Sequence, residues 1–117
     1  MSSDVALVYP AALTVSSDGP AGGEKKESMG VYLKDDSQLV NYRPVYVLDS
    51  LQRSGQFLYY NDGGFWVMGP TIGGGVAIVS IQQGLLTPPA TGWEYFDFDF
   101  KEDPYLTVTE SSESCLC

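Results

Sequence analysis

The sequence has no histidine, only two cysteines and only six basic residues in a chain of 117. Histidine is the usual proton shuttle near neutral pH and the commonest neutral metal ligand, so its absence excludes Ser-His-Asp and Cys-His catalytic arrangements. Fifteen Asp and Glu residues against six Lys and Arg give a formal charge of −9. Because nucleic acid and anionic lipid repel such a chain, we expect no nucleic-acid partner.

Long apolar runs are also absent from the sequence. No segment approaches the roughly 20 apolar residues that are needed to cross a bilayer. The segment 5–15 has the length of the apolar part of a signal peptide, but no positive charge precedes it and Pro10 lies inside it. Neither Asn41 nor Asn61 stands in an Asn-x-Ser/Thr glycosylation sequence. These features favour a cytoplasmic protein and leave secretion as the alternative.

The composition is that of a chain that buries a core. Apolar residues make up 44% of the sequence and aromatic residues 13%, in a length that suits one domain. The patterning divides the chain into an N-terminal extension with a glycine-rich loop (1–28), a β module (29–109) and a flexible tail (110–117). We expect the polar part of that extension, 16–28, to be a mobile loop with nothing to bury.

Between residues 29 and 109, short apolar segments alternate with turn residues, which is typical of an all-β domain. No segment has a 3.6-residue apolar period, so we expect little or no helix. Strands joined by short turns pair with their sequence neighbours, which predicts an antiparallel meander curled into an open barrel or a small sandwich. The expected strands in this region are 30–33, 44–48, 56–60, 65–68, 76–81, 93–100 and 105–109, with turns at 35–37 and 61–64. Within the N-terminal extension, residues 5–15 are expected to form one or two short strands interrupted by Pro10.

The middle of the chain resembles a small β-rich module with the pattern N-x-R-P-x-Y … Y-L-Y-Y … W-x-I/V-G … W. That module recurs in predicted proteins of invertebrates and unicellular eukaryotes, and its function is not established. The resemblance spans about residues 29–109, and the chain departs from the pattern at Phe57, where Tyr is common. It implies a β fold and modularity, and no activity, cofactor or site residue. The matching segments are 41–46, 56–60, 64–69 and Trp93.

Aromatic residues are concentrated around the expected hairpin turn at 61–64. Tyr and Trp combine a flat apolar area with a polar group and can bind sugars or peptides. One interpretation is a platform for a protein, peptide or glycan, beside an arginine that contacts an anionic group. The other is that these side chains form the core, because aromatics dominate core burial. The candidate ligand-binding residues are Arg43, Tyr59, Tyr60, Trp66 and Trp93.

Carboxylates are concentrated at the end of the expected strand 93–100. Asp97 and Asp99 would share one face of it, and Glu102 and Asp103 follow. Four carboxylates close together could hold a hard cation such as Ca²⁺, which would allow a divalent-cation-dependent enzyme. The alternative is a solvated face that guards an edge strand against pairing with another chain. Beyond this metal-site hypothesis we expect no cofactor.

The two cysteines, Cys115 and Cys117, lie within the last three residues. This end resembles the Cys-x-Cys terminus that Rab-type small GTPases use for double geranylgeranylation. It allows a lipid-anchored or redox-sensitive peripheral protein, with a membrane partner only if the tail is lipidated. The alternative interpretation is an exposed tail with oxidisable thiols and no further role. The function we favour is a non-catalytic recognition or interaction module of unknown ligand, with self-association through a strand edge as an additional expectation.

Overall fold

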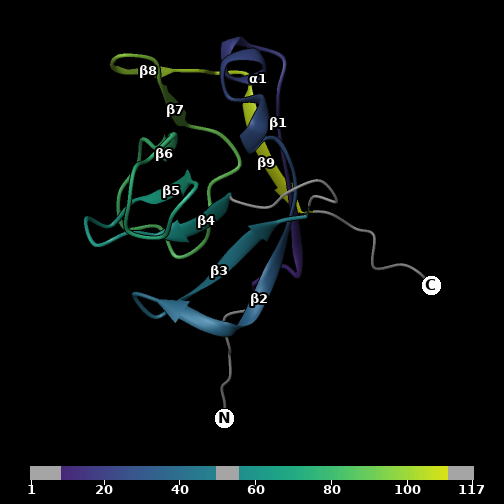
Figure 1. Ribbon diagram of the computed structural model, residues 1–117, viewed down its shortest axis with the longest axis vertical. Coiled ribbons are helices and arrows are strands. Elements are labelled where there is room, and N and C mark those ends of the chain that lie inside the picture. The colour runs from purple at the N-terminus through teal and green to yellow at the C-terminus, as the bar shows by residue number, and fades with distance from the viewer. Residues whose placement is uncertain (1–8, 50–55, 111–117) are drawn as a thin grey trace, which may run out of the picture.

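The computed structural model describes residues 9–49 and 56–110. These residues form one antiparallel sheet of nine strands, curled into a half-barrel, with no helix of seven or more residues (Figure 1). The all-β prediction is therefore confirmed. None of the described helices is long and apolar enough to cross a membrane. The strands are β1 (Ala12–Ser17), β2 (Gly30–Val40), β3 (Arg43–Leu48), β4 (Phe57–Tyr60), β5 (Trp66–Gly69), β6 (Ile78–Ser80), β7 (Trp93–Phe96), β8 (Phe100–Glu102) and β9 (Leu106–Glu110).

The sheet is a meander of eight strands with one strand added at one side. Its order is β8-β7-β6-β5-β4-β3-β2-β1-β9, so β1 to β8 follow the sequence, while β9 extends the sheet beyond β1. One backbone hydrogen bond then connects distant parts of the sheet. The Val108 N–H of β9 donates to the carbonyl oxygen of Ala90, just before β7, at 2.9 Å. This contact brings β9 close to the start of β7, as the curl of the sheet requires.

The polar segment 16–28 is ordered, and the prediction that it buries nothing is wrong. It completes β1 and then forms the short helix α1 (Pro20–Glu24) and the 3-10 turn η1 (Lys26–Ser28). Proline suits the first turn of a helix because its missing N–H would have no partner there. Ala21 and Ser28 are fully buried, and the Ser28 hydroxyl donates to Gln56 Oε1 at 2.9 Å.

The sheet also crosses the expected boundary between residues 28 and 29. Strand β1 pairs with β2 on one side and with β9 on the other. Residues 12–17 are therefore an inner strand of the same sheet as the expected module 29–109, next to its edge strand β9. A strand placed far from its partner β9 in the sequence gives no local signal of the pairing.

The expected turn at 35–37 is an irregularity within a longer strand. Asp35 Oδ1 accepts hydrogen bonds from the Ser37 N–H at 2.9 Å and from its hydroxyl at 2.6 Å. Strand β2 continues past this bend, and the chain reverses at Asn41 and Tyr42, whose φ angles are 53° and 69°. Two successive positive φ values are the signature of the turn that best fits hairpin twist. The local carboxylate-to-backbone bonds of Asp35 mimic a turn signal without reversing the chain.

The expected single strand 93–100 is a hairpin. Strands β7 and β8 pair with Phe96 opposite Phe100, and the Asp97 N–H donates to the Asp99 carbonyl oxygen at 2.8 Å. Phe98 at the tip has a φ of 63°. The alternation of Phe and Asp is common to a strand and to this tight hairpin, which is why the pattern favoured one continuous strand.

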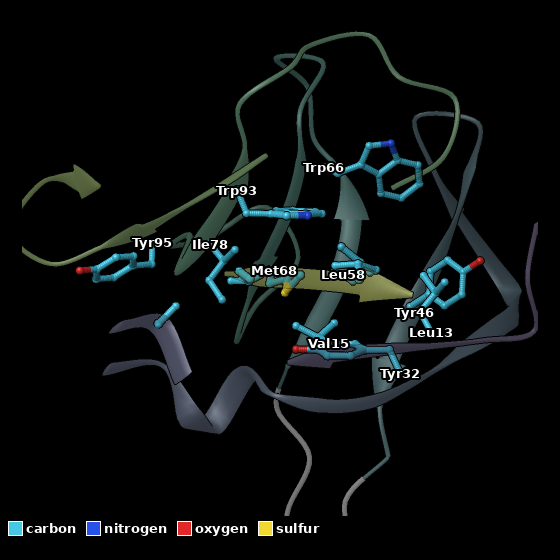
Figure 2. Packing of buried hydrophobic residues seen from close by; sticks show 13 residues of the cluster. Leu13, Val15, Tyr32, Tyr46, Leu58, Trp66, Met68, Ile78, Trp93 and Tyr95 are labelled. Atoms are coloured by element: carbon cyan, nitrogen blue, oxygen red, sulfur yellow. The ribbon is translucent and has the colours of Figure 1, made fainter. Parts of the chain in front are cut away.

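Two apolar clusters cover the two faces of the sheet. The inner cluster fills the concave side of the half-barrel, and Figure 2 shows the Trp93 indole among its side chains. The outer cluster is smaller and is centred on Val45, Tyr59 and Val67, with Phe65, Val76 and Val79 packed against it. The buried residues of the inner cluster are Leu13, Val15, Ala21, Tyr32, Tyr46, Leu58, Trp66, Met68, Ile78, Trp93, Tyr95, Leu106 and Val108.

Candidate functional site

Most of the predicted aromatic platform lies in the core. Trp66 and Trp93 are fully buried in the inner cluster (Figure 2), and Tyr59 is buried in the outer cluster. Both indole N–H groups are satisfied by the loop before β7, because Trp66 donates to the Leu85 carbonyl oxygen and Trp93 to that of Pro89, each at 3.0 Å. The prediction of a surface platform is therefore wrong for these three residues, and the alternative, that they form the core, is correct.

The other two platform residues form a partly exposed stack. The Arg43 guanidinium carbon lies 3.7 Å from the centroid of the Tyr60 ring, and Tyr60 meets Trp66 edge to face at 5.4 Å. Arg43 Nη1 donates to the Asn41 carbonyl oxygen at 3.4 Å, while Nε is a buried side-chain donor with no partner among the described residues. Cation–π contact thus holds the arginine against the sheet. Contact of Arg43 with an anionic group stays a prediction.

The motif residues around Arg43 connect elements of the fold. Asn41 Nδ2 donates to the Tyr60 carbonyl oxygen at 2.8 Å and to Asp62 Oδ1 at 3.1 Å. The Tyr46 hydroxyl donates to the Pro10 carbonyl oxygen at 2.7 Å, and burial raises the pKa of that phenol. These hydrogen bonds connect the β2–β3 hairpin to β4 and to the chain before β1. They therefore explain the presence of Asn41 and Tyr46 without a ligand.

Asp103, one of the four candidate metal ligands, is a buried structural carboxylate. Its Oδ2 accepts hydrogen bonds from the Ser17 hydroxyl at 2.6 Å and the Ala21 N–H at 2.9 Å. Its Oδ1 accepts from the Tyr105 N–H at 2.9 Å. Burial alone would raise the pKa of Asp103, but the three hydrogen bonds outweigh it and lower the pKa. Each oxygen is occupied by protein donors.

The remaining acidic residues do not complete a metal site. Asp97 forms an ion pair with Lys101 at 3.3 Å, and Asp99 Oδ1 accepts a hydrogen bond from the Phe100 N–H at 2.9 Å. Within residues 9–49 and 56–110, no group of three or more Asp, Glu, Cys or His side chains could hold a metal ion. The predicted site of Asp97, Asp99, Glu102 and Asp103 is therefore wrong, because a hairpin turn and a buried carboxylate separate its members. The predicted lipidation residues Cys115 and Cys117 lie outside the described residues.

A groove on the outer face of the sheet is the site that the sequence reasoning missed. Its volume is about 1040 Å³, which is at the upper end of the range for ligand pockets. Val67 and Val79 are cross-strand partners on its floor, and Gly75 and Val76 of the β5–β6 connection line it as well. Its main apolar lining residues are Phe65, Val67, Val76, Val79, Ile81, Phe96 and Phe100.

The β7–β8 hairpin supplies the most exposed aromatic surface beside this groove. Phe96 and Phe100 are 42% and 40% exposed, and their rings meet edge to face at 5.2 Å. Phe98, at the tip of the same hairpin, is 96% exposed. Exposed phenylalanines grouped on one hairpin mark a contact surface rather than a core. The outer groove, defined by the lining residues above, is therefore the candidate functional site.

The signal for the outer groove was present in the strand patterns. Strand β5 reads Trp-Val-Met-Gly and is buried throughout, so the sheet carries apolar residues on both faces. The outer cluster covers part of this second face, and the half-exposed Phe96 and Phe100 leave apolar surface beside it for contacts outside the sheet. Comparisons with protein-family models, with curated proteins and with solved structures found no match.

Proposed function

We propose that this protein is a non-catalytic recognition module that binds an extended segment of a partner protein in the outer groove. The observation that carries the proposal is the groove itself, an apolar hollow of about 1040 Å³ beside two half-exposed phenylalanines. Burial of apolar surface gives roughly 25 cal/mol per Å², so such a surface favours a ligand with apolar side chains.

A peptide fits this site better than a glycan does. Sugar recognition relies on tyrosine and tryptophan faces combined with polar groups, and the tryptophans here are buried. The groove has aliphatic side chains and phenylalanine as its main lining, beside the polar residues Lys25, Glu27, Gln56, Asn61, Ser80 and Glu94. The aliphatic and phenyl groups suit the apolar residues of a peptide.

The sheet edge next to the groove supports an extended conformation for that peptide. Strand β8 is the last strand of the sheet and, among the strands of residues 9–49 and 56–110, pairs only with β7. Peptides add to such edges through main-chain hydrogen bonds, while alternate side chains enter neighbouring pockets. Phe100 lies on β8 and also lines the groove, so a strand added there would place side chains against it.

The test is a titration of the ¹⁵N-labelled protein with extended peptides and, separately, with oligosaccharides. Peptides with apolar side chains should shift the backbone amides of residues 65–67, 77–81 and 94–100, and oligosaccharides should not. The double variant Phe96→Ser, Phe100→Ser should lose most of the response. Leu39→Ser, which removes a 67% exposed side chain from β2, should retain it. The proposal is overturned if peptides shift no amide of the groove or if the double variant binds like the wild type.

A further inference from the structure

Two glutamates face each other on the β7–β8 hairpin. Glu94 and Glu102 are direct cross-strand partners, as are Phe96 and Phe100. Alternate residues of a strand share a face, and cross-strand partners share it as well, so all four side chains belong to one face. Glu94, Phe96 and Phe100 line the outer groove. The hairpin thus presents a pair of carboxylates next to a pair of phenyl rings.

No basic side chain of the described part of the chain offsets the two carboxylates. Neither Glu94 nor Glu102 has a Lys or Arg nitrogen within 4.0 Å among residues 9–49 and 56–110. Lys101 lies between Phe100 and Glu102 in the sequence, but it is opposite Tyr95, on the other face, and is paired with Asp97. Lys25 and Glu27 also line the groove, and their formal charges cancel.

Like charges directly opposite each other destabilise a sheet. A substitution of either glutamate by a neutral residue would relieve that repulsion in the free protein. The repulsion would also be relieved by a cation placed between the carboxylates. The apolar groove and the carboxylates of Glu94 and Glu102, unpaired within the described residues, therefore favour a single ligand that carries both apolar groups and a positive charge.

We propose that the bound segment carries a lysine or arginine two residues away from an apolar side chain, an inference that rests on the proposed function. Its cationic group lies between Glu94 and Glu102, and the apolar side chain lies against Phe96 and Phe100. The spacing follows from the period of two along an extended peptide, because only residues i and i+2 reach the same face. The chain's charge of −9 adds long-range attraction for a basic segment.

The conformation of the hairpin tip is consistent with a contact surface here. Phe98 adopts a φ of 63° and is 96% exposed. Positive φ is a strained conformation for a bulky residue, and glycine or asparagine is usual at such a position. No packing within the described protein offsets the strain, so the phenylalanine is better explained by contact with a partner.

The test uses four short peptides as probes. The first, acetyl-Thr-Val-Thr-Lys-Thr-Val-Thr-amide, places valine, lysine and valine on one face of an extended chain. The second and third replace lysine by norleucine or by glutamate. The fourth, acetyl-Thr-Val-Lys-Thr-Thr-Val-Thr-amide, moves the lysine to the opposite face. Affinities are measured from the amide shifts of groove residues, at low and at high ionic strength.

We expect the first peptide to bind about tenfold more tightly than the norleucine and shifted-lysine peptides, since a hydrogen bond to a charged group contributes enough for that ratio. The glutamate peptide should bind most weakly. High ionic strength should reduce the advantage of the first peptide and leave the norleucine peptide almost unchanged.

The double variant Glu94→Gln, Glu102→Gln should bind the first peptide about as weakly as the norleucine peptide, because it lacks both charges. Its thermal midpoint should equal or exceed that of the wild type, so a loss of binding would not be a loss of folding. The control Asp18→Asn, Asp36→Asn removes two exposed carboxylates that do not line the groove and should keep the preference for lysine.

The outcomes separate this inference from the proposed function. If the lysine, norleucine and glutamate peptides all shift the groove residues with equal affinity, the charge preference is overturned and the groove is kept as a peptide site. The same holds if the glutamine variant retains the preference for lysine. If none of the peptides shifts a groove residue, the proposed function fails and the charge preference fails with it.

Discussion

The Asp103 carboxylate accepts a 2.6 Å hydrogen bond from the Ser17 hydroxyl, a residue 86 positions earlier in the chain. The same carboxylate accepts the Ala21 N–H in the first turn of α1, where helix N–H groups have no partner within the helix. Through Asp103 the end of β1, the start of α1 and the chain between β8 and β9 are therefore joined at one point.

Asp103→Asn should destabilise the protein by about 2 kcal/mol, because an amide must turn its NH₂ toward one set of N–H or O–H donors and leave them unsatisfied. Urea denaturation followed by circular dichroism measures the change in the free energy of unfolding. Asp99→Asn, at an exposed position of the β7–β8 turn, is the control and should change it by less than about 0.5 kcal/mol. Equal effects of the two substitutions would contradict the structural role of Asp103.

The lowered pKa of Asp103 makes that stabilisation depend on pH. The unfolded chain binds a proton at Asp103 near pH 4, while the folded protein still holds the carboxylate charged, so the stabilisation is complete above about pH 4 and is lost as the pH falls through the folded-state pKa. The difference in unfolding free energy between the wild type and Asp103→Asn should therefore shrink in acid. A difference that stays constant from neutral pH to pH ~2 would show that the charged form has no special stability in the fold.

The sequence predicts the local parts of this fold and misses the distant pairings. The hairpin at 61–64 is confirmed, since Asn61 Oδ1 accepts hydrogen bonds from the N–H groups of Gly63 and Phe65, all within five positions. The position of β1 depends on β9, whose residues lie more than eighty positions away. Alternation alone could not separate a strand from the β7–β8 hairpin, because the deciding feature is the positive φ of Phe98.

The candidate site is likewise predicted only in its local features. The sequence identifies the aromatic residues but not which of them are buried, because burial depends on the curl of the whole sheet. In the curled sheet Trp66 and Trp93 lie in the inner cluster, while Phe96 and Phe100 lie outside that cluster. The cross-strand position of Glu94 and Glu102 depends on the register of the hairpin, which the pattern of the segment did not reveal.

The chain after β5 passes so close to Gly69 that a side chain there would collide with the Gly75 carbonyl oxygen. Gly69→Ala should therefore destabilise the protein by about 2 kcal/mol or more, because a backbone atom cannot move aside as a flexible side chain can. It should also disturb the outer groove, since Gly75 lines it. Thermal unfolding and the amide spectrum of residues 65–81 measure the two effects.

Gly75→Ala is the matched control for that substitution. No atom of the described part of the chain lies within 4 Å of the place that a Cβ at Gly75 would take. The alanine should be neutral or slightly stabilising, because it reduces the freedom of the unfolded chain. If Gly69→Ala is equally harmless, the close approach of the two segments is not present in solution.

Phe98 and Tyr42 give a comparison between two exposed aromatic residues at hairpin tips. Both have positive φ, 63° and 69°, and both are more than nine-tenths exposed. Glycine accepts this conformation without steric cost, so Phe98→Gly and Tyr42→Gly should each raise the unfolding free energy by about 0.5–1 kcal/mol. Chemical denaturation measures this gain.

The two variants should differ in binding, because only Phe98 belongs to the hairpin that borders the outer groove. Phe98→Gly should weaken binding of the valine-lysine-valine peptide, since it removes an exposed phenyl ring from that hairpin, while Tyr42→Gly should leave binding unchanged. A more stable protein that binds less well is the expected result of replacing a residue kept for contact rather than for folding. Equal affinity of the two glycine variants for the peptide would exclude Phe98 from the contact surface and confine the site to the groove and the cross-strand pair Glu94 and Glu102.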